Sequence, residues 1–203
     1  MPFVNALFPN PKLISGLQVG FTLPTTIVGS GSSEYRIQKL QHFKKKWVWP
    51  SRAMSTVDRR IIQNFLIDTA RFSLNSFKFL DPDNNNWSNT PLAWASSSSF
   101  YLTERGGADT HPIFRYDTDV IVRLNGSIVS VTQTTFNGLP VIVVPSANSS
   151  SNVTISGTFF FAARYDSADF NMSLSALQWS GVGSGSKPFV DTVDNISLIE
   201  VFE

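Results

Sequence analysis

Apolar and polar residues alternate along much of this chain, with the two-residue period that half-buried β-strands show. The alternation is regular over residues 35–43, which follow a Gly- and Ser-rich stretch at residues 29–33. Further strands are predicted at residues 119–124, 127–132, 141–144, 153–162, 171–177 and 196–202. Asn125-Gly126 joins two of them, and it predicts a β-hairpin because a type I′ turn needs positive φ angles at both central positions.

One segment has instead the three- and four-residue spacing of an amphipathic helix, which is predicted over residues 55–74. Ser55 is a suitable N-cap and Asp58 suits the positive end of the helix dipole. The apolar stripe of this helix comprises Val57, Ile61, Ile62, Phe65, Leu66, Thr69 and Ala70. We expect the stripe to pack on a sheet, with Arg59 and Arg60 on the side that faces outward.

Stretches of low complexity divide the chain into three parts. These stretches lie at residues 84–86, 96–99 and 146–152. They suggest an N-terminal part at 1–94, a middle β unit at 95–163 and a closing segment at 164–203. The closing segment is too short for a core of its own, so we expect it to rejoin the first sheet. The predicted fold class is mainly β (α+β), a β-sandwich or barrel-like domain with one packed amphipathic helix and an inserted small β unit.

Charge is distributed unevenly along the sequence. Residues 1–80 hold eleven Lys and Arg against three Asp and Glu, a net charge of +8. Residues 81–203 hold five against twelve, a net charge of −7. Such a division suits contact with a second copy, a neighbouring protein or a polyanion, so interaction is the first functional hypothesis.

Composition narrows the class of protein. Only 15% of the residues are charged, below the usual share of about 25%, and 42% are hydrophobic. This composition fits equally a subunit that hides its surface in an assembly and a monomer with a Ser-, Asn- and Thr-rich surface. Cysteine is absent, no stretch reaches the length of a spanning helix, and residues 1–20 do not resemble a signal peptide. We expect synthesis in a cytoplasm and no membrane attachment.

Residue clusters with the chemistry of a catalytic or metal site are few. Glu104, Asp109 and His111 are suitable groups for acid–base or metal chemistry, but their spacing matches no recognised metal motif and a polar loop explains them equally well. Residues 81–86 are faintly similar to the start of a calcium loop, although Leu92 stands where the bidentate Glu is needed, so a turn is favoured. We therefore expect no catalytic residue, no cofactor and no metal.

A run of three lysines followed by two tryptophans lies near the middle of the first part. Lys44, Lys45, Lys46, Trp47 and Trp49 have the composition of a nucleic-acid surface, but a solvated strand end with core tryptophans is the favoured interpretation. Sugar stacking is the alternative role for the tryptophans, which are Trp47, Trp49, Trp87, Trp94 and Trp179.

Short motifs occur in a fixed order from one end of the chain to the other. They are Ser30-Gly31 with Glu34-Tyr-Arg36, Lys44-Lys-Lys-Trp47, the helix, Phe77-Lys-Phe79-Leu-Asp81, Ala163-Arg164-Tyr165-Asp166-Ser-Ala-Asp169 and Leu198-Ile-Glu200. In this order they resemble the phage distal tail protein family, which includes a gene-transfer-agent member. The stretch from Arg164 to Asp169 is the most specific part of the resemblance.

The resemblance implies a structural virion protein and not an enzyme. Such proteins form a ring, usually a hexamer, that joins the tail tube protein to the hub or baseplate protein at the tail tip. The tape-measure protein and then the genome pass through the lumen. The expected location is thus the virion, after synthesis in the bacterial host cytoplasm. The alternative is a carbohydrate-binding or adhesin-like β module of the tail tip, and a small hydrolase using residues 104–111 is a weaker third hypothesis.

A cyclic ring needs two different surfaces on each subunit, and opposite charges on them would fix the register of the contact. The candidate residues on the positive surface are Arg36, Lys39, Lys44, Lys45, Lys46, Arg59 and Arg60. On the negative surface they are Asp166 and Asp169, while Arg164 either joins the interface or pairs internally with one of these aspartates. A lumen that passes DNA should not bind it tightly, so we expect no specific nucleic-acid binding and a protein partner for the three lysines.

Overall fold

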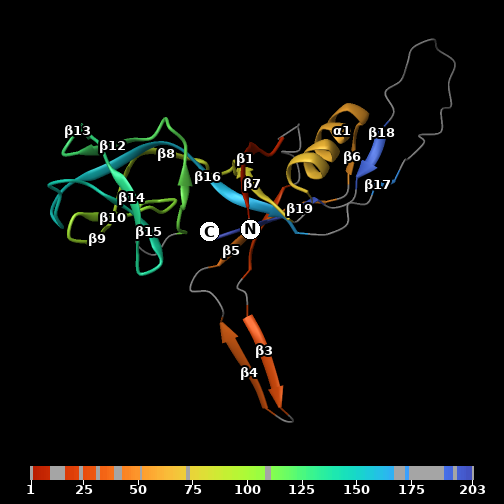
Figure 1. Cartoon of the computed structure of the whole chain (residues 1–203), viewed down its shortest axis with the longest axis horizontal. Helices are drawn as coiled ribbons and strands as arrows, with labels where there is room; N and C mark the ends of the chain where they lie inside the picture. Colours follow the sequence, from red (N-terminus) through yellow and green to blue (C-terminus); the bar gives the residue numbers. More distant parts are fainter. Residues whose placement is uncertain are drawn as a thin grey trace. The chain divides into compact units, whose positions relative to one another are not determined.

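The computed structural model describes most of the chain as strands, with one helix (Figure 1). The described residues are 2–9, 17–22, 25–30, 33–38, 43–50, 52–71, 74–107, 111–166, 172–173, 190–193 and 196–202. The predicted mainly-β, α+β fold class is confirmed. Within the described ranges the strands form no closed barrel.

The chain divides into two compact units. The first unit combines Met1–Lys78 with Ala163–Val201, and the inserted unit comprises Phe79–Ala162 with Phe202–Glu203. The second boundary lies within one residue of the predicted one at 163/164. The first boundary lies at Lys78 and not at residues 94/95, which corrects the sequence-based division.

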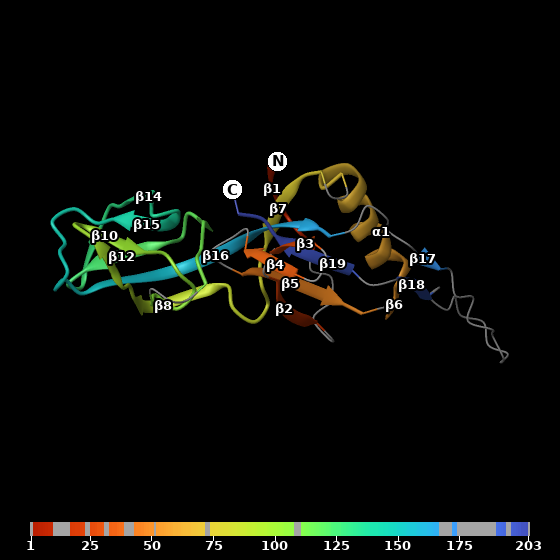
Figure 2. The ribbon, with the colours of Figure 1, turned by 90° about the horizontal axis from the view of Figure 1, so that it is seen from below.

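The first unit is built on a sheet in which neighbouring strands come from distant parts of the sequence (Figure 2). The strands in spatial order are β1 (Phe3–Leu7), β7 (Ser76–Phe79), the end of β16 (Val153–Tyr165), β19 (Ile196–Glu200), β5 (Lys44–Trp49) and β2 (Gln18–Thr22). The closing strand β19 is antiparallel to both β5 and β16. The end of the chain therefore returns to the first sheet, where the sequence placed it.

Burial alternates along these strands because successive side chains point to opposite faces. In β5, Lys45, Trp47 and Trp49 are buried, whereas the residues between them are half-buried. In β19, Ile196 and Leu198 are buried in the same way. One face of the sheet is thus the core face of the first unit.

The helix packs against aromatic side chains of this unit. It comprises α1 (Thr56–Asn64) and a π-helical turn over Phe65–Thr69, in which the N–H of Ala70 donates to the carbonyl oxygen of Phe65 at 2.9 Å. The ring of Phe65 lies 5.0 Å from that of Phe77 and 5.5 Å from that of Phe8. The regular helical segment therefore ends at Thr69, earlier than the predicted residue 74.

The predicted apolar stripe of the helix is only partly buried. Ile62, Leu66 and Ala70, spaced by four residues, are fully buried. Val57 and Ile61 are 67% and 44% exposed, which corrects their predicted place in the core. The sequence therefore predicted a wider buried face than the helix has, because the surrounding aromatic side chains cover only part of the apolar stripe.

The first unit contains two smaller sheets. β3 (Thr25–Ser30) and β4 (Ser33–Gln38) pair with each other as an antiparallel hairpin (Figure 1). β6 (Arg52–Ser55), β17 (Met172–Ser173) and β18 (Val190–Val193) form a three-stranded sheet. Of the strand predicted at 35–43, residues 35–38 belong to β4, residues 39–42 lie outside the described ranges, and Phe43 stands directly before β5.

The inserted unit has two groups of paired strands. One group pairs with β16 or with each other: β8 (Asn86–Pro91), β11 (Arg115–Tyr116), β12 (Ile121–Leu124) and β13 (Ser127–Val129). The other is a sheet in the order β14 (Thr132–Phe136), β15 (Leu139–Val143), β10 (Ser99–Tyr101) and β9 (Trp94–Ser96).

Pairing of β8 explains why the inserted unit begins earlier than predicted. Thr90 pairs with Ile155 of β16, and the ring of Trp87 lies 4.6 Å from that of Phe159. The serine-rich stretch 96–99, which suggested a boundary, forms the turn between β9 and β10, with Ser97 at a φ of 45°. Low complexity here marks a turn and not a linker.

Two Asn-Gly pairs form hairpin turns in the inserted unit. Asn125 and Gly126 have φ angles of 50° and 88° between β12 and β13, as the sequence predicted. Asn137 and Gly138 have φ angles of 51° and 78° between β14 and β15, where sequence reading overlooked the same signal.

Candidate interface surface on β5, β19 and β16

Three adjacent strands of the first unit carry five of the charged residues in the motifs of the family resemblance. The register aligns Lys46 of β5 with Ile199 of β19, and Ile199 with Arg164 of β16. Residues paired across antiparallel strands share a face. Lys46 and Arg164 therefore lie on one face of the sheet, opposite to the core face.

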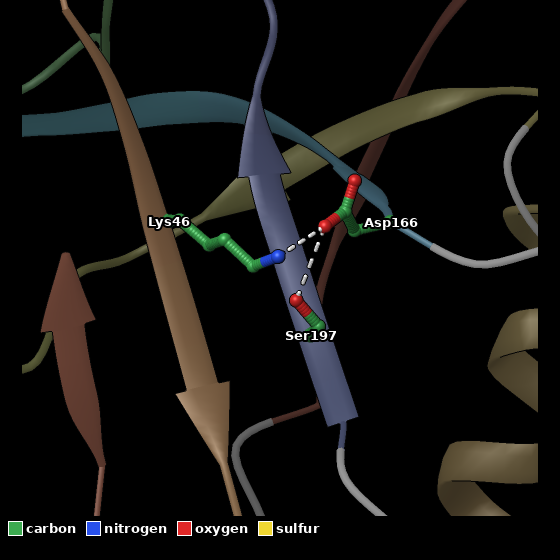
Figure 3. A network of polar contacts seen from close by, with 3 residues as sticks. All are labelled: Lys46, Asp166 and Ser197. Carbon is green, nitrogen blue, oxygen red and sulfur yellow. Dashed lines mark hydrogen bonds and ion pairs between the residues drawn. The ribbon is translucent and has the colours of Figure 1, made fainter. Parts of the chain in front are cut away.

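Lys46 and Asp166 form an ion pair on this face (Figure 3). The Nζ of Lys46 lies 2.6 Å from Oδ2 of Asp166, and the Oγ of Ser197 donates to the same oxygen at 3.4 Å. The N–H of Asp166 also donates to the carbonyl oxygen of Ser197 at 2.9 Å. Predicted members of the positive and the negative surface thus contact each other within one chain.

Lys45 and Glu200 contact each other near the core face. Their exposed fractions are 5% and 3%, and the backbone N–H of Lys45 donates to Oε2 of Glu200 at 2.9 Å. Burial of a carboxylate is tolerated when such hydrogen bonds replace those to water. The burial of Lys45 limits its role as an exposed interface residue, and Glu200 fastens the end of β19 to the start of β5.

Lys44 and Arg164 carry like charges close to each other. Partial burial and the nearby guanidinium of Arg164 lower the pKa of Lys44 below its ordinary value, while the carboxylate of Glu200 acts in the opposite direction. Both side chains are half-buried. An anionic group of a partner placed between them would relieve this repulsion.

The remaining predicted interface residues are placed less closely together. Arg60 is exposed on α1, whereas Arg59 is half-buried. The backbone of Arg36 pairs with Ile27 in the β3–β4 hairpin. Lys39 and Asp169 lie outside the described residues.

The Glu104 to His111 segment closes a loop in the inserted unit. The N–H of Glu104 donates to the carbonyl oxygen of His111 at 2.9 Å, and Nδ2 of Asn84 donates to Oε2 of Glu104 at 3.2 Å. The His111 ring lies 5.9 Å from the ring of Phe161 and 6.0 Å from that of Phe202. The positions of Asp109 and its two neighbours fall outside the described ranges.

The stretch with a faint likeness to a calcium loop forms a turn. Oδ1 of Asp81 accepts from the N–H of Asp83 at 3.1 Å, and the carbonyl oxygen of Asp81 accepts from the N–H of Asn84. Within the described ranges, no group of three or more His, Cys, Asp or Glu residues is arranged to hold a metal ion.

The tryptophans differ in exposure. Trp47, Trp49 and Trp87 are at most 1% exposed, and the indole N–H of Trp87 donates to the carbonyl oxygen of Thr103 at 2.9 Å. Trp94 is 45% exposed and its indole N–H donates to the carbonyl oxygen of Ser97. Trp179 lies outside the described residues.

Exposed apolar residues on β2 and beside β5 were missed by sequence reasoning. Val19, Phe21 and Phe43 are 38%, 63% and 54% exposed. The sequence signal was an alternating Val19-Gly-Phe21 pattern, which by itself predicts a half-buried strand and cannot show that its neighbours leave the apolar side uncovered.

Comparison of the sequence with protein-family models gives no match, and neither does comparison with curated proteins. Among the described residues, no helix is long and apolar enough to cross a membrane.

Proposed function

We propose that this protein is a structural subunit that forms a ring at the distal end of a phage tail. In this role it joins the tail tube protein to a hub or baseplate protein, and the tape-measure protein passes through the lumen. Its location is then the tail tip of the virion, and its contribution is assembly and not catalysis. The observation that carries the proposal is that the segments resembling the distal tail family lie side by side in one sheet.

These segments are remote in the sequence but adjacent in the sheet. Ala163 of β16 pairs with Glu200 of β19, and Leu198 of β19 pairs with Trp47 of β5. The side chains of the motif residues Lys46, Asp166 and Glu200 make polar contacts between these three strands. If this chain shares its fold with the distal tail family, the residues that carry the resemblance should lie where they stabilise that fold. Their contacts in one sheet therefore favour a shared fold over a chance match of short motifs.

The distribution of charge supports an assembling subunit. The first unit holds thirteen Lys and Arg against eight Asp and Glu, a net charge of +5. The inserted unit holds three against seven, a net charge of −4. Opposite charge on two units of one chain suits a heterologous contact between copies, which is the contact that a ring repeats.

Light scattering and negative-stain imaging of the purified protein test this function. The expected result is a closed ring of about six copies, the number that the family resemblance implies. A strict monomer at high protein concentration would contradict the proposal.

A glycan-binding role in the same virion is the second candidate, favoured by Trp94. Trp94 is 45% exposed, and its indole N–H donates a hydrogen bond to the carbonyl oxygen of Ser97, which orients the ring. Exposed aromatic rings stack on the apolar faces of sugars. Glycan-array binding that disappears in Trp94→Ala, with the ring assembly intact, would support this role; an array without binding by the unmodified protein would exclude it.

A further inference from the structure

Two hairpin turns of the inserted unit have the same sequence and nearly the same backbone geometry. Asn125-Gly126 joins β12 to β13, and Asn137-Gly138 joins β14 to β15. The φ angles of the two asparagines are 50° and 51°, and those of the two glycines are 88° and 78°. All four residues are exposed. Neither the local conformation nor the access of water therefore distinguishes the two turns.

The first of these asparagines is held by the residue that precedes β16. Oδ1 of Asn125 accepts a hydrogen bond from the backbone N–H of Asn152 at 3.1 Å. The backbone N–H of Asn125 donates to the carbonyl oxygen of Asn152 at 2.8 Å. One bond restrains the side chain and the other the main chain, so both resist rotation of Asn125.

The second asparagine lacks this restraint. Within the part of the chain that the structure describes, no residue forms a hydrogen bond with the side chain of Asn137. A Cβ built on Gly138 would meet no atom within 4 Å, as is also true of Gly126. The side chain of Asn137 is therefore free to rotate toward the backbone of Gly138.

The strands beside the two turns are also held differently. β12 lies between β13 and β16 and pairs with both. β14 pairs only with β15 among the described strands, and it is the last strand of its sheet. Four of the five residues of β14 are exposed, and Phe136 is half-buried. Because local opening is easiest where few contacts are lost, the turn at Asn137 should open more readily than the turn at Asn125.

We propose that Asn137 is a site of spontaneous deamidation, and that Asn125 is protected from the same reaction. The lone pair of the Gly138 backbone nitrogen attacks Cγ of Asn137 and forms a new C–N bond. The C–N bond of the side-chain amide breaks, and its NH₂ group takes up the proton of the backbone nitrogen and leaves as ammonia. A cyclic imide then links the two residues. Glycine favours this step because it has no side chain to block the attack and its backbone is conformationally permissive.

Water is the only other reactant. If it adds to Cγ of the imide, the bond from Cγ to the nitrogen breaks and an ordinary aspartate results at position 137. If it adds to the main-chain carbonyl carbon, the main chain runs through Cγ and the product is an isoaspartate. In both cases an amide and water become a carboxylate and ammonium, so no oxidant or reductant is needed.

Either product changes the β14–β15 hairpin. The carboxylate adds a negative charge to a unit whose net charge is already −4. The isoaspartate also lengthens the main chain by a methylene group inside a two-residue turn, and such turns set the register of the strands that they join. Modification of Asn137 should therefore loosen β14. This inference goes beyond the proposed function and does not depend on ring formation.

The experiment follows both turns during incubation of the full-length protein in a mildly alkaline buffer. Peptide mapping by mass spectrometry measures conversion at each asparagine, and labelling by an isoaspartyl methyltransferase detects the isoaspartate. In the folded protein, conversion at Asn137 should be about tenfold faster than at Asn125, where two hydrogen bonds must break before the ring closes. In urea the two rates should become similar, because each asparagine is followed by glycine.

A variant without one of the two restraints tests their role. Asn152→Pro removes the N–H that binds Oδ1 of Asn125, so conversion at Asn125 should accelerate while conversion at Asn137 stays the same. Circular dichroism verifies that this variant is folded, and the comparison within the unmodified protein stands without it. An unchanged rate at Asn125 in the folded variant would overturn the proposed protection.

The unmodified protein supplies the remaining decisive outcomes. Conversion at Asn125 that equals or exceeds conversion at Asn137 in the folded protein would overturn the inference. The same holds if neither site reacts in the folded protein while both react in urea, because the turn at Asn137 would then be as well protected as the turn at Asn125.

Discussion

Lys46 and Asp166 lie 120 positions apart in the sequence and meet in an ion pair with an N–O distance of 2.6 Å. The first residue belongs to the basic half of the chain and the second to the acidic half. Because β19 and the end of β16 return to the first sheet, part of the opposing charge is neutralised within one subunit. The opposing charges of +8 and −7 on the sequence halves become +5 and −4 on the structural units.

The Lys46–Asp166 pair should contribute little to stability by itself. Lys46 is 37% exposed and Asp166 is 24% exposed, and pairs screened by water are worth about 0.2–1 kcal/mol. A double-mutant cycle with Lys46→Met and Asp166→Asn, followed by urea unfolding, measures the coupling free energy. We expect a value within that range that falls at high salt. A coupling of several kcal/mol would show that the pair is far less screened than its exposure indicates.

Neighbouring isoleucines on the helix should differ in their effect on stability. Ile62 is fully buried and Ile61 is 44% exposed. Ile62→Ala leaves a cavity in the core and should lower the free energy of unfolding by about 2–5 kcal/mol. Ile61→Ala should change it by about 0.5 kcal/mol. Urea denaturation of both variants tests the observed helix face, since the wider predicted stripe requires similar losses.

Two glycines with positive φ should respond differently to alanine. Gly106 has a φ of 76°, and an added Cβ would collide with the backbone carbonyl of Pro91. Gly126 has a φ of 88° in a turn with open space around it. Gly126→Ala should cost about 1–2 kcal/mol from backbone strain alone. Gly106→Ala should cost at least about 3 kcal/mol because the collision adds to that strain.

Thermal unfolding of the two glycine variants provides the comparison, with Gly20→Ala as control. Gly20 lies in β2 with nothing near its would-be Cβ. A Gly106→Ala protein as stable as the control would contradict the close approach of this loop to Pro91.

Local patterns predicted the elements well and their partners poorly. The Asn125-Gly126 turn and the helix start depend on a few adjacent residues, so their sequence signals are strong. The first unit boundary was misplaced because β8 belongs with β16, a pairing between residues more than sixty positions apart that no local pattern encodes. The exposure of Val57 was missed for the same reason. The spacing of apolar residues shows which side of the helix is buried, but it does not show how much of that side other segments cover.

The charged site was predictable by residue type but not by contact. Lys46 and Asp166 were both identified, on opposite surfaces, because their roles were inferred from net charge along the sequence. Their pairing depends on the order β16–β19–β5, which only the fold supplies. The exposure of Val19 and Phe21 was not predictable, because their alternating pattern indicates a half-buried strand but does not show which segment covers its apolar side.

The ionisation of Lys44 should depend on Arg164. Burial and the Arg164 guanidinium lower the pKa of Lys44 in the folded state below the ordinary 10.5, against the opposing effect of Glu200. Just below pH 10.5 the unfolded chain therefore binds more protons at this position, so stability should rise with pH in that window. Arg164→Gln should raise the pKa of Lys44, whereas Arg60→Gln, on the exposed side of α1, should not. NMR titration of the lysine Nζ and Cε resonances measures both; an unchanged pKa in Arg164→Gln would show that burial alone lowers it.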